Sequence, residues 1–200
     1  MARLTRSNWV RTPLCLVLAL AACKPGPPPP TSSPSCEVSF SPHGGCTEAV
    51  VAEIGRARAS VLVQAYSFTS TPIAKALVDA HQRGVRIEVI LDKSQRGEKY
   101  SSADFVAHAG IPTRIDARHA IAHNKVMIVD GQTVITGSFN FTKAAEEQNA
   151  ENLLVIRDAA LAERYAANWK AHLDHSERYA GRGEESDAPL PRSRPDDRPR

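Results

Sequence analysis

The chain lacks a hydrophobic segment long enough to cross a bilayer as a mature helix. Its apolar run at residues 14–22 is about half the length that such a helix needs. The part that can fold also lacks a basic excess. The whole chain has a net charge of +3, but residues 36–178 hold 16 Lys and Arg against 17 Asp and Glu. The folded part therefore has no global basic surface of the kind that many nucleic-acid-binding domains carry.

The N-terminal apolar run has the features of an export signal. Basic residues precede it and small residues end it, which is typical of a secretory signal peptide over residues 1–22. Leu20-Ala21-Ala22-Cys23 resembles a bacterial lipobox. We therefore expect export to the bacterial envelope, with cleavage before Cys23 and lipidation of that residue as a membrane anchor. A simple signal peptide that is cut elsewhere, leaving a periplasmic protein, is the alternative.

Composition divides the rest of the chain into three parts. Residues 23–35 are rich in Pro and Ser and predict an extended tether. Residues 36–179 have enough apolar content for one folded domain. Residues 180–200 are polar, with Pro and mixed charges, and predict a disordered tail.

Cysteine is scarce, and the folded part has only Cys36 and Cys46. In an oxidising, exported compartment a disulfide between them is the default expectation. The short strand and turn between them could return one cysteine to the other. His43 raises a zinc site as the alternative, although only three ligands would be local where a structural zinc site wants four.

Strand-like and helix-like segments alternate along the folded part. Strands are predicted at residues 37–41, 60–66, 85–91, 112–115 and 152–157, and helices at 47–57, 71–83, 102–109 and 159–179. Two more strands flank the turn signal Asp130-Gly131. This order predicts an α/β fold, an α-β-α sandwich whose mixed, mostly parallel sheet is flanked by helices on both faces. Trp169 and Tyr165 are spaced as core residues of the last helix.

One short segment concentrates groups that can attack a phosphodiester without a metal. It begins with His123 and Lys125 and ends in the turn at Asp130. Residues two apart on a strand lie on the same face with their Cα atoms about 7 Å apart, so the imidazole and the ammonium can both contact one phosphate. Ser138 and Asn140 repeat this spacing after the return strand. Asp130 is either an organiser of the site or only a turn former.

The pattern H-x-K-x4-D-x6-G-S-x-N resembles the signature of the phospholipase D superfamily. The resemblance implies a phosphodiesterase that needs no metal and no cofactor. His123 would attack phosphorus and form a phosphohistidine, while Lys125, Ser138 and Asn140 would bind the non-bridging oxygens. Glu151 stands where the family places the carboxylate that orients the nucleophile. An ordinary charge at a strand edge is the alternative for Glu151.

The chain has one copy of a motif that larger superfamily members carry twice. The small bacterial endonucleases of the superfamily solve this by forming a two-fold homodimer, which implies the same here. An isologous interface places two copies of one residue near the axis, so one His123 would act as nucleophile and its twin as general acid. His119 and His123 are spaced for a metal pair only on a helix, and the sequence around them predicts a loop and a strand.

Three functions remain open. A nonspecific nuclease is favoured, because a single-motif domain of this size resembles the bacterial endonuclease branch. A phospholipase D acting on phospholipid headgroups is the alternative, since the predicted lipid anchor would hold it beside its substrate. An inactive, tethered envelope protein is the third, and the intact set of catalytic residues argues against it.

Overall fold

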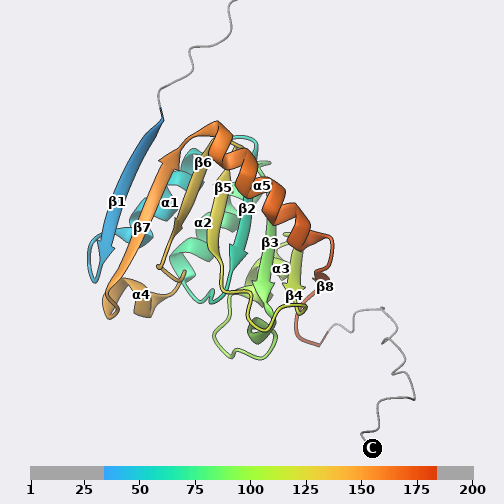
Figure 1. The fold of residues 1–200 in the computed structure, drawn as a ribbon. Coiled ribbons are helices and arrows are strands. Elements are labelled where there is room, and N and C mark those ends of the chain that lie inside the picture. Colours follow the sequence, from blue (N-terminus) through green and yellow to red (C-terminus); the bar gives the residue numbers. More distant parts are fainter. Residues whose placement is uncertain (1–33, 184–200) are drawn as a thin grey trace, which may run out of the picture. The chain divides into compact units, whose positions relative to one another are not determined.

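Eight strands form one mixed sheet in the computed structural model, which describes residues 34–183 (Figure 1). The strands are β1 (Ser35–Ser41), β2 (Ser60–Ala65), β3 (Arg86–Asp92), β4 (Thr113–Asp116), β5 (Lys125–Val129), β6 (Thr133–Gly137), β7 (Glu151–Arg157) and β8 (Glu177–Tyr179). Their order in the sheet is β1-β7-β6-β5-β2-β3-β4-β8. The predicted signal peptide, the lipidation site Cys23 and nearly all of the tether and tail lie outside the described residues.

The strand directions confirm a mixed sheet but not a mostly parallel one. Only the pairs β2–β3 and β3–β4 are parallel, and the other pairs are antiparallel. The parallel pairs are joined by crossovers that contain helices, as parallel connections require. β5 and β6 instead meet at the tight turn Asp130-Gly131, which can only join antiparallel strands.

Helices cover both faces of the sheet, as the sequence predicts. Four helices are α1 (Cys46–Arg56), α2 (Thr71–Gln82), α3 (Ala103–His108) and α5 (Ala159–Leu173), and the short α4 (Lys143–Glu147) and a 3-10 turn (Lys93–Arg96) complete the set. α5 crosses the face nearest the viewer in Figure 1, whereas α1, α2 and α3 lie behind the sheet. The main core lies between the sheet and these rear helices, and a second apolar cluster lies under α5.

The buried residues of α5 follow the expected pattern. Trp169 is 4% exposed, and its indole Nε1 donates a hydrogen bond to the Val63 carbonyl at 2.9 Å. Tyr165 packs at the margin of the same cluster. Within residues 34–183, every helix is too short or too polar to cross a membrane.

The last helix ends earlier than the sequence predicts. α5 stops at Leu173, and residues 177–179 form β8, which pairs antiparallel with β4. This pairing supplies partners for backbone groups along an edge that would otherwise be open. The Tyr179 hydroxyl donates to Asp104, and burial together with this contact raises the pKa of Tyr179 to about 12. The pairing of β8 with β4 has thus outweighed the helical sequence pattern that extends to residue 179.

The predicted disulfide between Cys36 and Cys46 is wrong, because both thiols are free. Cys36 is exposed near the start of β1, and Cys46 is buried where α1 begins, beyond the other end of that strand. Five residues of extended chain from Cys36 to Ser41 span about 17 Å, whereas a disulfide holds its Cα atoms within about 7 Å. Cys36, His43 and Cys46 do not form a cluster of possible metal ligands among the described residues, so the zinc alternative is not supported either. Burial raises the pKa of the Cys46 thiol to about 11, which makes it unreactive.

Candidate active site

The predicted catalytic residues gather at one edge of the sheet. Because β5 runs antiparallel to β2, its start lies beside the carboxyl ends of β2, β3 and β4. Lys125 opens β5 directly opposite Ala65, the last residue of β2. Binding sites in open α/β sheets form outside the carboxyl ends of the strands. The topology therefore places the motif at the edge where chemistry is expected.

The loop that carries His123 is fixed on both sides of that residue. The Ala122 N–H donates to the buried Asp92 carboxylate at 2.7 Å, and the Tyr66 N–H donates to the Asn124 carbonyl at 2.8 Å. The imidazole between these two anchors is exposed. The backbone around the nucleophile is thus ordered before a substrate arrives.

Tyr66 joins the two principal side chains. Its ring centroid lies 4.6 Å from that of His123, and Lys125 Nζ lies 5.1 Å from the same Tyr66 centroid. Lys125 Nζ also donates to the His123 carbonyl at 3.0 Å. Sequence reasoning assigned Tyr66 no role. The one available signal was an aromatic residue directly after a buried strand.

Lys125 is nearly buried, with 8% of its surface exposed. Burial lowers the pKa of Lys125, and the negative charge of Glu151 offsets part of that shift. Glu151 begins β7, and its Oε1 accepts a hydrogen bond from Asn149 Nδ2 at 3.1 Å. Among residues 34–183, no hydrogen bond joins Glu151 to His123. The predicted orienting contact is therefore absent within one subunit.

Ser138 and Asn140 follow β6 at the same edge. Phe139 and Phe141 on either side are fully buried, and the Phe141 carbonyl accepts hydrogen bonds from the N–H groups of residues 69 and 70 beyond β2. These anchors fix Asn140, whose Oδ1 is buried without a hydrogen-bond partner among the described residues. The exposed Ser138 hydroxyl accepts from the Asn152 N–H at 3.0 Å, which leaves its own hydrogen for a ligand.

Asp130 lies away from this site, so the structure supports the turn former, and not the organiser of the site, of the two interpretations. It lies beyond the far end of β5, about 17 Å from Lys125 along the strand. Its carboxylate accepts hydrogen bonds from the N–H groups of Arg58, Ala59 and Ser60 at 3.0, 2.8 and 2.9 Å. Its φ of 53° is left-handed, as the turn requires. Asp130 thus anchors the turn to the start of β2.

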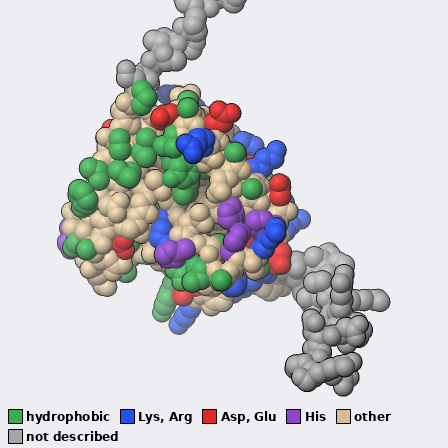
Figure 2. All heavy atoms as spheres, viewed as in Figure 1, with side chains coloured by type: hydrophobic (Ala, Val, Ile, Leu, Met, Phe, Trp, Pro, Cys, Tyr) green, Lys and Arg blue, Asp and Glu red, His purple; other side chains and the backbone are tan. Residues whose placement is uncertain are grey.

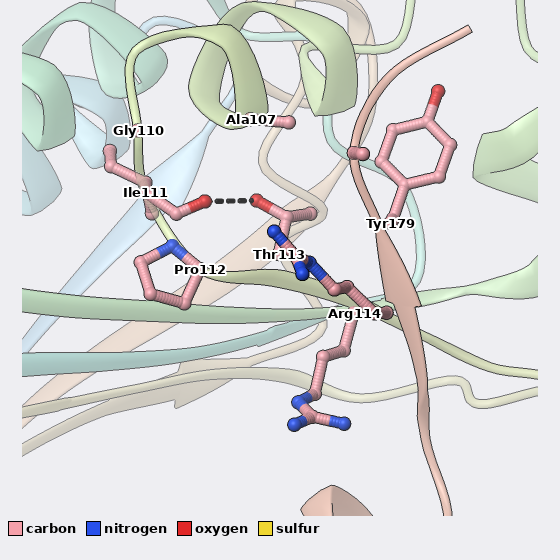
Figure 3. Close-up of a pocket in the computed structure, with 9 residues that line it drawn as sticks. Ala107, Gly110, Ile111, Pro112, Thr113, Arg114 and Tyr179 are labelled. Carbon is pink, nitrogen blue, oxygen red and sulfur yellow. Dashed lines mark hydrogen bonds between the residues drawn. The ribbon is translucent and has the colours of Figure 1, made fainter. Parts of the chain in front are cut away.

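A hollow of about 460 Å³ lies elsewhere, between the end of α3, the start of β4 and β8 (Figure 3). Thr113 Oγ1 donates to the Ile111 carbonyl within it at 3.0 Å, and Arg114 and Tyr179 are further lining residues. It meets β4 at the end opposite the catalytic edge. None of the motif residues lines it.

Sequence comparison relates the chain to proteins with the same motif. The family model for the cardiolipin synthase, PLD-like domain matches residues 50–173. A phospholipase D of Rickettsia typhi is 43% identical over 141 residues, which are 70% of this chain and 69% of the relative. A phospholipase D of Rickettsia bellii is 46% identical over 130 residues, and the match spans 65% of each protein.

Solved structures with the same fold agree with this relation. Nuc from Salmonella typhimurium, a phospholipase D family member, is 41% identical, with a TM-score of 0.71, covering 74% of this chain and 99% of that chain. NucT from Helicobacter pylori is 24% identical with a TM-score of 0.69, covering 74% of this chain and 100% of that chain, and supports the fold alone.

Proposed function

Because the chain belongs to the phospholipase D superfamily, we propose that it is a phosphodiesterase working through a phosphohistidine on His123. The neutral imidazole attacks phosphorus, and a P–N bond forms as the P–O bond to the leaving group breaks. Lys125, Ser138 and Asn140 bind the non-bridging oxygens and stabilise the charge of the transition state. Water then attacks phosphorus and releases His123.

One observation carries this proposal: an exposed imidazole is held by ordered backbone beside a nearly buried ammonium. A substrate analogue with a radioactive phosphate should leave an acid-labile, alkali-stable label on the protein when the reaction is quenched early. His123→Ala should neither turn over nor take up the label. Full activity of His123→Ala would overturn the assignment of the nucleophile.

A second histidine must protonate the leaving group, and we assign it to the His123 of a second subunit. The homodimer is supported by an apolar area on the sheet face that α5 leaves uncovered. Val38 and Phe40 on β1 are 52% and 63% exposed. They stand opposite Leu154 and Asn152 on β7, and Figure 2 shows the apolar side chains gathered on this face. Phe40 lies close to the catalytic edge, so a subunit that covers it approaches that edge.

Subunit exchange tests this arrangement. An excess of His123→Ala subunits mixed with wild type should reduce activity well below simple dilution, because each mixed dimer keeps only one imidazole. Sedimentation should show a dimer, and dilution below its dissociation constant should abolish activity. A fully active monomer would contradict the shared site.

Nucleic acid is the favoured substrate. Lys93 and Arg118 are exposed at the same edge as His123, and Lys93 Nζ binds the carbonyl of His119 in the loop that leads to the nucleophile. Such cations can follow a phosphate backbone, whose binding is strongly salt-dependent. The solved structure of Nuc, a phospholipase D family member of which this chain covers 99%, supports a family member of this size.

A phospholipid substrate is the second candidate, and one side chain favours it. Ile121 is 57% exposed two residues before the nucleophile, where it could enter a lipid surface. The matched Rickettsia relatives are named phospholipase D.

Two matched variants separate these substrates. Lys93→Gln should weaken cleavage of plasmid DNA and reduce its salt dependence, while Ile121→Ser should leave it unchanged. If lipid is the substrate, Ile121→Ser should weaken cleavage of phosphatidylcholine vesicles, and Lys93→Gln should leave that cleavage unchanged. Both assays should be run with and without EDTA at a temperature where the metal-free protein is folded, and cleavage should persist in the chelator because the proposed chemistry uses no metal. Cleavage of vesicles but not of DNA would reject the favoured substrate.

We also propose that the protein is exported to the bacterial envelope and lipidated at Cys23. The lipobox-like sequence supports this proposal. Metabolic labelling with a radioactive fatty acid should mark the wild type and not Cys23→Ser. Equal labelling of both would reject lipidation at this residue.

A further inference from the structure

Three histidines converge on one buried carboxylate at some distance from the catalytic residues. Asp116 ends β4 and is fully buried. Its Oδ2 lies 2.7 Å from His172 Nδ1, 3.0 Å from His119 Nδ1 and 3.3 Å from His175 Nε2. All four atoms lie within 4.8 Å of one another. Histidine side chains are clustered on the face shown in Figure 2.

The cluster joins two segments that are far apart in the sequence. Asp116 and His119 belong to the end of β4 and the loop after it, whereas His172 lies in the last turn of α5 and His175 follows that helix. Three strand spacings separate β4 from β5 in the sheet, which is about 14 Å. The cluster therefore lies on the catalytic edge but apart from Lys125.

One histidine of the cluster, His175, has a ring nitrogen without a hydrogen-bond partner among the described residues. His175 Nε2 is buried and has no hydrogen-bond partner among the described residues, although it faces Asp116 Oδ2. A buried polar atom without a partner destabilises the fold. A cation between the four atoms would give that nitrogen a ligand bond.

The surroundings hold the cluster in place. Asp116 Oδ1 accepts from the Arg118 N–H at 3.1 Å, which fixes the carboxylate while Oδ2 faces the imidazoles. The Ser176 hydroxyl donates to the His172 carbonyl at 2.7 Å.

We propose that Asp116, His119, His172 and His175 bind one divalent transition-metal ion of the zinc class. Three imidazole nitrogens and one carboxylate oxygen are ligands that Zn²⁺ accepts. Tetrahedral ligands about 2.05 Å from a metal lie about 3.3 Å from one another, and the three nitrogen-to-Oδ2 distances are 2.7, 3.0 and 3.3 Å. Four protein ligands close the coordination sphere, so the ion is structural and does not take part in phosphodiester cleavage.

The metal fastens the end of α5 to the loop that leads into the catalytic site. His119 stands four residues before His123, and Ala122 between them is bonded to Asp92. Metal binding therefore adds a further restraint on the sheet edge near β8 and on the loop before the nucleophile, which the Ala122–Asp92 hydrogen bond already holds. The expected effect of metal removal is lower stability of the whole fold, with the chemical groups still present.

Metal binding to the purified full-length chain, with its cysteines reduced, is the direct test. Equilibrium dialysis against Zn²⁺ should give one tightly bound ion per chain. Co²⁺ should give the intense visible bands of a tetrahedral site without sulfur-to-cobalt bands, because the ligands are nitrogen and oxygen. His119→Ala removes a ligand that is 44% exposed, and it should weaken binding at least about 100-fold, since even outer-shell changes cost 10–100-fold.

The matched control is His108→Ala, which removes an exposed imidazole at the end of α3 and should bind like wild type. The melting temperature should be measured with a chelator and with free Zn²⁺ at about 100 times the wild-type dissociation constant. For wild type and His108→Ala, the value with chelator should be roughly 5–10 °C lower than the value with zinc. Chelation should lower the melting temperature of His119→Ala by no more than about 2 °C, because a site at least about 100-fold weaker is at most half filled at that zinc concentration.

Circular dichroism checks that each variant folds, and X-ray absorption of the zinc-loaded wild type gives a reading that needs no variant. Nitrogen and oxygen near 2.0 Å, with no sulfur near 2.3 Å, are expected. Substoichiometric binding, sulfur ligands, or unchanged affinity in His119→Ala would overturn the site.

Discussion

Substitution of Asp130 tests whether this residue of the motif contributes to stability and not to catalysis. Its carboxylate accepts three backbone hydrogen bonds, from residues 58, 59 and 60, at the sheet edge opposite the nucleophile. Asp130→Asn keeps one acceptor oxygen and tolerates the left-handed backbone, whereas Asp130→Ala loses every acceptor. Both changes should destabilise the fold, and neither should remove a catalytic group.

The magnitude follows from those bonds. A hydrogen bond to a charged group contributes about 1.5–3 kcal/mol, but the carboxylate is partly exposed and shared by three donors. We therefore expect about 1–2 kcal/mol for Asp130→Asn and about 3 kcal/mol for Asp130→Ala, which also strains a left-handed residue. In a domain of this size the Ala variant should melt roughly 6–12 °C lower.

The dependence on pH has a defined sign. Burial opposes ionisation, but the N–H groups of Ser60, Ala59 and Arg58 outweigh it and lower the pKa of Asp130. The stabilisation is therefore present above the unfolded pKa of about 3.9 and is lost as pH falls through the folded value. The difference in unfolding free energy between wild type and Asp130→Asn should be constant from about pH 5 to pH 7 and shrink below about pH 4.

Urea unfolding and steady-state kinetics on a chromogenic phosphodiester measure the two effects separately. Asp130→Asn should retain kcat/KM within a few fold at temperatures where it is folded. His123→Ala should give the reverse pattern, with stability near that of wild type and no turnover. The reasoning fails if folded Asp130→Asn is as inactive as His123→Ala.

The remaining predictions concern the catalytic edge. Lys125→Met should lower kcat about 10²–10³-fold, as loss of one charge-stabilising donor does, with little change in melting temperature; an unchanged kcat would remove the ammonium from the mechanism. At Gly137, φ is 149° and an added Cβ would lie 2.2 Å from the Asn152 carbonyl oxygen. Gly137→Ala should therefore cost about 3 kcal/mol or more in unfolding free energy, whereas Gly131→Ala, with open space around it, should cost only about 1–2 kcal/mol; equal costs would contradict the close approach. Tyr66→Phe should keep kcat near wild type because the ring remains, while Tyr66→Ala should lower it about 10-fold; equal losses would point to the hydroxyl instead.

The spacing of the predicted site residues could place them at one edge of the sheet because they are close in the chain. His123 and Lys125 are separated by one residue, and a strand followed by a tight return is a local structure. Ser138 and Asn140 return to the same edge because that hairpin is short. The same logic could not place Asp130, since a strand carries its two ends to opposite edges of the sheet.

Features set by distant pairing were beyond sequence reasoning. The helical pattern toward residue 179 gave no sign that residues 177–179 would pair with β4. The contact of Tyr66 with His123 joins segments that meet only through the β2–β5 pairing. The straight path of β1 separated Cys36 from Cys46, although ten residues of chain with a turn could have brought them together.

The histidine cluster was hidden for the same reason. The sequence around His119 offers only His123 as a nearby histidine, whereas the structure brings His172 and His175 from the end of α5 beside it. An i, i+3 pair of histidines near a helix end was the available signal. This pair indicates a metal site only together with Asp116, which the sheet places beside it.

Each edge strand of the sheet pairs with a strand that is distant in the sequence. β1 pairs with β7, and the ion pair between Glu37 and Arg157 spans 120 residues. Non-local contacts of this kind slow folding. During synthesis, β1 has no partner until β7 has emerged from the ribosome, so the sheet cannot be completed early.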